Sequence, residues 1–215
     1  MASKKGLRLK PARGLNCPSI DLGLPPLSDA DLRNLDFVVR HADIIGYSFV
    51  ETPEDIRTLV NKISSRKTDK PLPGLVLKIE TGLAVHNLPR LIVEAGSKLP
   101  VAVMIARGDL AVEIGLERLS EIQEEMLWLC EAAHIPVIWA TQVLEGLLKN
   151  GLATRAETTD AAMGQRAECV MLNKGRYQAE GLAFLGQVLL RMDRHQTKKT
   201  AQLSPLMSWQ DSQKL

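Results

Sequence analysis

The sequence predicts an α/β fold in which a parallel sheet is built from about five βα units. From about residue 28 onward, short apolar runs alternate with amphipathic helical stretches, which is the pattern of parallel strands joined by helices. The runs are centred on Ile44, Val76, Val103, Val137 and Val170, so neighbouring centres lie 32, 27, 34 and 33 residues apart. Each step is long enough for one strand and one crossover helix.

The apolar runs predict the positions of the strands. They lie at residues 44–47, 75–80, 101–106, 137–141 and 169–172. Short runs dominated by apolar residues suit parallel strands, which are buried on both faces. Because parallel strands point the same way, the residues that follow them are expected to meet at one edge of the sheet.

Local signals predict the helices between the strands. Ser28 is a capping residue before one helix, and Thr52-Pro53-Glu54 supplies a cap, a proline at the first helical position and a first-turn acid for another. Apolar residues at helical spacing predict further helices within 116–134 and 178–194. We expect the apolar faces of these helices to pack on the sheet.

Composition argues against several classes of protein. The chain has 27 basic and 25 acidic residues, so its net charge of +2 gives no strong attraction to nucleic acid or an anionic membrane. Only 4% of residues are aromatic, which leaves few rings for stacking on bases. No apolar run approaches the ~18 residues of a membrane span. Cys17, Cys130 and Cys169 form no CxxC pair, which favours free thiols in the cytoplasm.

Lys78 and Glu80 form the first candidate site, at the end of the second apolar run. The two-residue period of a strand places both on one face, with Ile79 on the other. A cation and a carboxylate at the carboxyl end of a barrel strand would look into the usual active-site region. An ordinary ion pair at a strand end is the simpler interpretation of this tripeptide alone.

Gly108 and Asp109 form the second candidate site, in the predicted loop after the run 101–106. Gly108 lets backbone approach a ligand closely, and Asp109 offers a hard oxygen ligand for a divalent cation. Judged on this loop alone, Asp109 serves equally well as a plain helix cap. Thr141 is the third candidate, because it ends the next apolar run. A threonine there is usually structural, and its hydroxyl gains interest only from Lys78, Glu80 and Asp109 at neighbouring strand ends.

Several strings of the sequence resemble one enzyme family in order and spacing. LKIET, VMIARGDLAVEIG, PVIWATQVLEGLLKNGLATRAE and AECVMLNKG look like the last four strands of the pyruvate kinase barrel. RGLNCPSIDLGLPPLSDADLRNLDF and ADIIGYSFVETPEDI are similar to that family's return from its lid domain and its fourth strand. The resemblance implies a partial TIM (β/α)8 barrel of the phosphoenolpyruvate/pyruvate type, containing strands four to eight. It divides the chain into a lid-return segment (1–27), the partial barrel (28–194) and a polar tail (195–215).

The resemblance also implies a chemical role for each candidate residue. Glu80 and Asp109 match the carboxylates that hold the essential Mg²⁺ or Mn²⁺, and Lys78 matches the lysine that neutralises the transferred phosphoryl group. Thr141 matches the threonine associated with protonation of the enolate, and Gly108 and Asp109 match the backbone amides that meet the substrate carboxylate. The family's substrates are phosphoenolpyruvate and ADP, and its products are pyruvate and ATP.

Departures from the family pattern bear on activity. The family's K⁺ site and phosphate-gripping arginine belong to its first three strands, so we expect their residues, and the lid domain, to be absent from this chain. Asn173-Lys174-Gly175 stands where the family commonly has Ser-Gly-Glu, which affects the nucleotide side of the site.

The sequence is therefore compatible with three functions. The first is pyruvate kinase chemistry in glycolysis, with poor activity of the short chain alone. The others are a non-catalytic barrel remnant or assembly partner, and metal-dependent enolate chemistry of the aldolase type. Five βα units leave two open sheet edges, so we also expect a homo-oligomer or a complementary chain.

Overall fold

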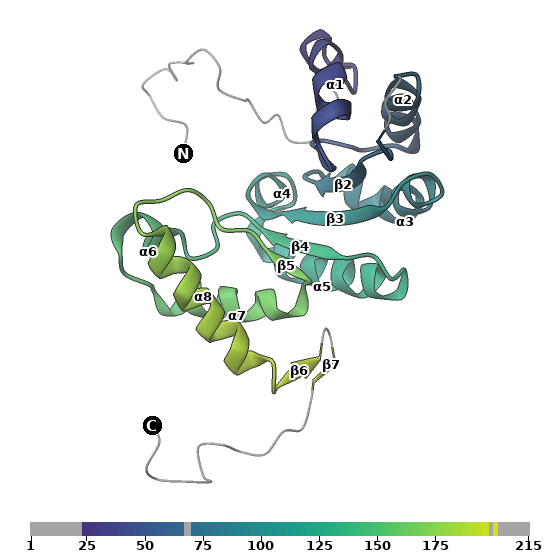
Figure 1. Cartoon of the computed structure of the whole chain (residues 1–215). Coiled ribbons are helices and arrows are strands. Elements are labelled where there is room, and N and C mark those ends of the chain that lie inside the picture. Colours follow the sequence, from purple (N-terminus) through teal and green to yellow (C-terminus); the bar gives the residue numbers. More distant parts are fainter. Residues whose placement is uncertain (1–22, 67–69, 198–199, 202–215) are drawn as a thin grey trace, which may run out of the picture.

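The computed structural model describes residues 23–66, 70–197 and 200–201. Its centre is a five-stranded, all-parallel sheet (Figure 1). The strands are β1 (Ile44–Tyr47), β2 (Gly74–Ile79), β3 (Val101–Ala106), β4 (Val137–Ala140) and β5 (Cys169–Val170). They lie side by side in chain order. This order is the winding of a (β/α)8 barrel, whereas a doubly wound sheet reverses direction at its centre.

Helices join the strands. They are α1 (Asp29–His41), α2 (Pro53–Ser64), α3 (Gly82–Gly96), α4 (Arg107–Ile114), α5 (Leu116–Ala132), α6 (Glu145–Asn150), α7 (Arg155–Met163) and α8 (Gln178–Met192), with a short 3₁₀ turn, η1 (Gly164–Arg166). A small antiparallel hairpin follows, β6 (Gln196–Thr197) and β7 (Thr200–Ala201). Among the described residues, no helix is both long and apolar enough to cross a membrane.

The predicted caps are confirmed at two helix starts. The Ser28 side chain accepts a hydrogen bond from the backbone of Asp31, and the Asp31 carboxylate accepts one in return from Ser28 N, at 2.9 Å. Thr52 and Asp55 make the same reciprocal pair at the start of α2, with Pro53 at the first helical position. Each box satisfies two backbone N–H groups that the helix itself cannot pair.

The predicted strands are confirmed with small changes at their ends. β2 begins and ends one residue earlier than the run 75–80, β4 stops at Ala140, and β5 is only two residues long. β4 stops because Thr141 and Gln142 have positive φ values of 68° and 57°, which no strand can continue through. Residues 1–22 of the predicted lid-return segment and 202–215 of the predicted tail lie outside the described residues.

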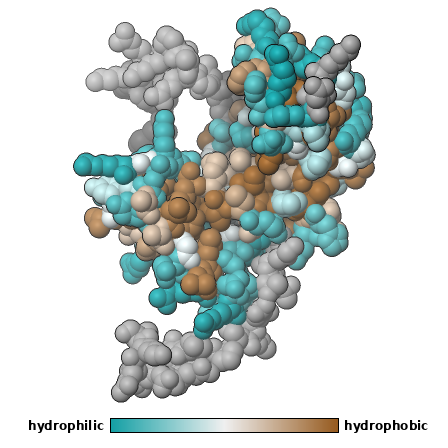
Figure 2. All heavy atoms as spheres, in the orientation of Figure 1, coloured by the Kyte–Doolittle hydropathy of each residue, from teal (hydrophilic) through white to brown (hydrophobic). Residues whose placement is uncertain are grey.

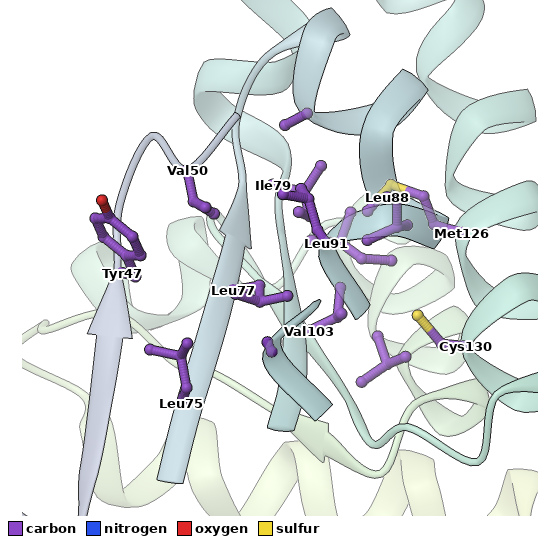
Figure 3. Packing of buried hydrophobic residues seen from close by; sticks show 14 of the residues in the cluster. Tyr47, Val50, Leu75, Leu77, Ile79, Leu88, Leu91, Val103, Met126 and Cys130 are labelled. Atoms are coloured by element: carbon purple, nitrogen blue, oxygen red, sulfur yellow. The ribbon is translucent and has the colours of Figure 1, made fainter. Parts of the chain in front are cut away.

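One face of the sheet packs on helices to form the hydrophobic core. Leu77 and Ile79 of β2 and Val103 of β3 are fully buried, and Figure 3 shows them beside Leu88 of α3 and Met126 of α5. Each fully buried side chain of this size stabilises the fold by about 1.5–3 kcal/mol. This face anchors the strands and so fixes where their carboxyl ends lie.

The opposite face of the sheet is less covered. The strand register aligns Lys78, Met104, Ile138 and Cys169 in one row across β2 to β5. Met104 and Ile138 are half-buried and Cys169 is exposed. Figure 2 shows hydrophobic residues gathered in a band across the middle of the molecule. In a closed barrel, side chains of this face fill the interior.

We expect the chain to associate in solution. Within the described residues, β1 pairs only with β2 and β5 only with β4, so each has one edge of unpaired backbone groups. A homo-oligomer or a complementary chain would cover these edges and the half-covered face. Size-exclusion chromatography with light scattering over a dilution series measures the association. A monodisperse monomer near 23.7 kDa with cooperative thermal unfolding would contradict it.

Candidate functional site

The candidate residues lie at the edge of the sheet where the strands end. Lys78 lies near the end of β2 and Glu80 directly follows it, α4 begins directly after β3, and Thr141 directly follows β4. Figure 1 shows α4 and α6 at this edge. In parallel barrels, the carboxyl ends of the strands carry the functional groups.

Lys78 and Glu80 form a largely buried ion pair. Lys78 Nζ lies 2.9 Å from Glu80 Oε1, and the Glu80 side chain is only 3% exposed. Glu80 Oε2 accepts a hydrogen bond of 2.6 Å from the backbone N–H of Phe49. The prediction that Lys78 and Glu80 share a face is therefore confirmed, while Ile79 enters the core. A buried carboxylate needs such partners, because desolvation alone would make its charge costly.

Ser48 is a site residue that the sequence did not single out. Its hydroxyl accepts a hydrogen bond of 2.6 Å from Lys78 Nζ. An ammonium has three N–H donors, and Ser48 and Glu80 occupy two of those of Lys78 among the described residues. The third is left for a ligand. Ser48 could have been found by the rule that pointed to Lys78, because it directly follows a strand.

Asp109 lies in the first turn of α4. The structure corrects two interpretations, because Asp109 is in a helix rather than a loop and the capping position belongs to Ala106, which makes no side-chain cap. The half-buried Asp109 carboxylate has no hydrogen bond or ion pair to any other described residue. It therefore remains available as an oxygen ligand. The backbone N–H groups of an uncapped helix start also favour an anion nearby.

Thr141 and Gly108, which come from separate strings, are in direct contact. Thr141 Oγ1 accepts a hydrogen bond of 2.8 Å from the backbone N–H of Gly108. Thr141 makes this contact with φ of 68°, a left-handed conformation that costs a branched residue about 1–3 kcal/mol. Strain of this kind persists only where surrounding contacts hold it. The Thr141 hydroxyl therefore accepts from the Gly108 amide, which by the family resemblance would donate to a substrate carboxylate.

The donor set at this edge fits a divalent cation that the substrate would help to coordinate. Glu80 and Asp109 follow neighbouring strands, β2 and β3. The described part of the chain contains no group of three or more His, Cys, Asp or Glu side chains able to hold a metal. Mg²⁺ commonly takes one or two protein carboxylates and completes its octahedron with water and substrate oxygens. Two carboxylates are therefore sufficient as the protein's share.

Glu157 connects the two helices that follow β4. Its carboxylate accepts hydrogen bonds from the backbone N–H groups of Gly146 in α6 and Thr154 at the start of α7. Burial by itself raises the pKa of Glu157, but hydrogen bonds from Thr154 and Gly146 outweigh it and hold that pKa below its ordinary value. Glu157 is therefore a charged link that orders the chain beyond Thr141.

Gly175 lies where the backbone passes another carbonyl closely. A Cβ at this position would stand 2.3 Å from the Leu148 carbonyl oxygen. The same oxygen accepts a hydrogen bond from Tyr177 N at 3.0 Å, so it cannot easily move away.

Substituting Gly175 with alanine is expected to destabilise the fold by about 2–3 kcal/mol, because the new methyl group overlaps a fixed carbonyl. Gly186 of α8 is the matched control, since nothing lies within 4 Å of its Cβ position. Gly186→Ala is expected to stabilise by about 0.5–1 kcal/mol, because glycine is unfavourable within a helix. Urea unfolding of both variants measures the difference. Equal midpoints would show that the close approach at Gly175 is absent.

Known proteins match most of this chain. The model of the family described as "pyruvate kinase, barrel domain" matches residues 2–182. The chain is 35% identical to pyruvate kinase 1 of Trypanosoma brucei brucei over 188 residues, which cover 84% of this chain and 36% of that protein. It is 33% identical to the pyruvate kinase of Methanocaldococcus jannaschii over 197 residues, 88% of this chain and 42% of that protein.

A solved structure agrees with these matches. The crystal structure of a pyruvate kinase from Cryptosporidium parvum resembles this fold with a TM-score of 0.75 and 29% sequence identity, covering 82% of this chain and 37% of the other. The chain thus spans about 34–42% of the length of such relatives. The matched parts, the parallel sheet and its strand order support one conclusion: the chain belongs to the pyruvate kinase family, within the barrel domain.

Proposed function

We propose that this chain carries the metal-binding and phosphoryl-binding part of a pyruvate kinase site. In this proposal Glu80 and Asp109 hold Mg²⁺ or Mn²⁺, and Lys78, Thr141 and Gly108 act on phosphoenolpyruvate or its enolate. The observation that carries the proposal is the buried pair of Lys78 and Glu80, 2.9 Å apart, at the edge where Asp109 and Thr141 follow the next strands. ADP as acceptor, a glycolytic role and a cytoplasmic location are parts of the same proposal.

Lys78 would act by charge. Phosphoryl transfer passes through a loose, negatively charged transition state, so catalysis depends on positioning and on cations. When bound, a divalent cation would polarise the oxygens of the phosphoryl group and the enolate. Ser48 and Glu80 hold Lys78 Nζ in place, and its remaining N–H would donate to the phosphoryl group. The burial of Glu80 strengthens these interactions because the local dielectric is low.

Thr141 would relay a proton to the enolate, donating its hydroxyl hydrogen to the enolate carbon while Oγ1 takes a proton from solvent water. Its Oγ1 accepts from the backbone N–H of Gly108 at 2.8 Å, and that bond leaves the hydroxyl's own hydrogen free to point elsewhere. A substrate carboxylate at the start of α4 would compete for the same Gly108 amide. Binding would then release Thr141 Oγ1 and turn the hydroxyl toward the bound substrate.

Binding of oxalate, a planar dianion shaped like the pyruvate enolate, tests the proposal. Calorimetry is expected to detect oxalate binding in the presence of Mn²⁺ and none in its absence. Thr141→Val is expected to change oxalate affinity while leaving Mn²⁺ affinity unchanged, because it removes a hydroxyl and no carboxylate. Oxalate binding that is the same with and without Mn²⁺ would contradict the proposed site.

Metal-dependent enolate chemistry of the aldolase type is the second candidate. The residues proposed at this edge would serve the enolate and its metal, whereas the segment at Asn173-Lys174-Gly175, on the predicted nucleotide side, departs from the family pattern. Enolate chemistry without phosphoryl transfer needs neither ADP nor a lid. Product analysis distinguishes the two, because phosphoryl transfer forms ATP from phosphoenolpyruvate and ADP, whereas the aldolase-type alternative releases pyruvate from oxaloacetate with Mn²⁺ and forms no ATP.

A further inference from the structure

Arg107 is a buried arginine that the proposed chemistry does not use. It is the first residue of α4, and its side chain is 10% exposed. Nε donates to the carbonyl of Ala140 at 2.8 Å, and Nη2 donates to the carbonyl of Thr141 at 2.7 Å. Both carbonyls belong to the turn that ends β4. A single planar group therefore holds two successive peptide units of that turn.

Asp160 of α7 fixes the guanidinium from the other side. Its carboxylate accepts from Nη1 and from Nη2 of Arg107, the latter at 3.0 Å. The guanidinium also lies over the Trp139 ring, with Cζ 4.4 Å from the ring centroid. These contacts use all but one of the N–H groups of Arg107. Its position is therefore determined by β4 and α7 together.

The turn held in this way is the one that aims the Thr141 hydroxyl. Thr141 and Gln142 both have positive φ, an arrangement that their own side chains disfavour. Gly108, whose N–H meets Thr141 Oγ1, is the residue directly after Arg107. Arg107 thus ties the Thr141 turn and the start of α4 together beside the bond between Thr141 and Gly108.

We propose that Arg107 and Asp160 are positioning residues that hold the Thr141 hydroxyl on the first turn of α4. The catalytic consequence of this placement rests on the proposed function, but the placement itself does not. Lysine cannot replace Arg107, because a point charge with a flexible stem cannot contact two carbonyls and a carboxylate in one plane. Arg107→Lys should therefore release the Thr141 turn without removing the positive charge.

Hydrogen exchange at the Gly108 amide tests the proposal, because its protection reports the bond to Thr141. The measured quantity is the ratio of the protection factor of the Gly108 amide to that of the Val103 amide, which donates to Pro136 O in the sheet. Arg107→Lys is expected to lower this ratio by about tenfold or more. Arg166→Lys is the matched control, since Arg166 is also 10% exposed and pairs with a carboxylate, Glu124, of similar exposure. It should leave the ratio unchanged.

Three further variants keep the test decisive. Asp160→Asn removes the charge that fixes Arg107, so it should also lower the ratio. This variant decides the test if Arg107→Lys does not fold. Thr141→Val should lower the ratio, and Thr141→Ser should retain it. An unchanged ratio in Asp160→Asn or in Thr141→Val, or an equal fall in Arg166→Lys, would overturn the proposal. The measurement needs neither metal nor substrate, so failure of the proposed function would leave this result intact.

Discussion

Glu80→Gln is expected to weaken Mn²⁺ binding by about 10²-fold. The substitution removes one of two carboxylates that would hold the cation, and an amide oxygen is a poor replacement for a charged ligand. It also leaves Lys78 without its ion-pair partner at 2.9 Å, so an uncompensated positive charge would repel the metal. The amide oxygen can still accept from Phe49 N–H, which preserves the local fold. Calorimetry with Mn²⁺ measures the affinity.

Asp109→Asn should weaken Mn²⁺ binding by a similar factor. Asp109 makes no hydrogen bond or ion pair elsewhere in the described part of the chain, so this substitution has little structural effect. Glu121→Gln, on an exposed position of α5, is the control for loss of one negative charge and should bind Mn²⁺ like the unaltered protein. If all variants bind equally, the metal assignment at Glu80 and Asp109 is wrong.

The 215-residue chain, assayed by itself, is expected to convert phosphoenolpyruvate and ADP to pyruvate at least about 10⁴-fold more slowly than a full-length relative. Removal of one preorganised charge-stabilising group often costs ~10²–10³ in rate, and by the family resemblance the phosphate-gripping arginine, the K⁺ site and the lid belong to parts of the enzyme other than strands four to eight. The chain spans 36% of the Trypanosoma relative. A lactate dehydrogenase-coupled assay run on both proteins measures the difference.

As a control, the full-length relative is added to the reaction that contains this chain. Its normal turnover there shows that the mixture contains no inhibitor. Turnover within about tenfold of the relative would contradict the expectation and would mean that this chain suffices for phosphoryl transfer. Measurable turnover, however slow, supports a partial active site. No measurable turnover supports the non-catalytic remnant, which can still bind Mn²⁺.

The order and type of the elements could be predicted from the sequence because their causes are local. The apolar runs at 44–47 and 101–106 became β1 and β3 with unchanged bounds. Ser28 and Thr52 cap their helices through residues three positions later. Lys78 and Glu80 share a face because side chains alternate along any strand. None of these features depends on a distant part of the chain.

The assignment of Lys78, Glu80, Gly108, Asp109 and Thr141 to roles came from family resemblance, and the structure adds their surroundings. Ser48 follows a strand and could have been noted on that ground, but its contact with Lys78 and that of Phe49 with Glu80 span 30 and 31 residues of sequence, which no local pattern shows. The predicted loop around Asp109 was wrong because α4 begins immediately after β3. Sequence patterns do not show whether a helix starts at the strand end or a few residues later.

The sequence by itself determined the α/β class, the strand positions, two helix caps and the shared face of Lys78 and Glu80, all of which arise from residues within a few positions of one another. Only the tertiary structure decided which strand ends meet, that Thr141 adopts a left-handed turn against Gly108, and that Arg107 is held between β4 and α7. The Arg107 contacts join residues 33 to 53 positions apart. They depend on the sheet register and on helix packing, which are set by the buried core as a whole.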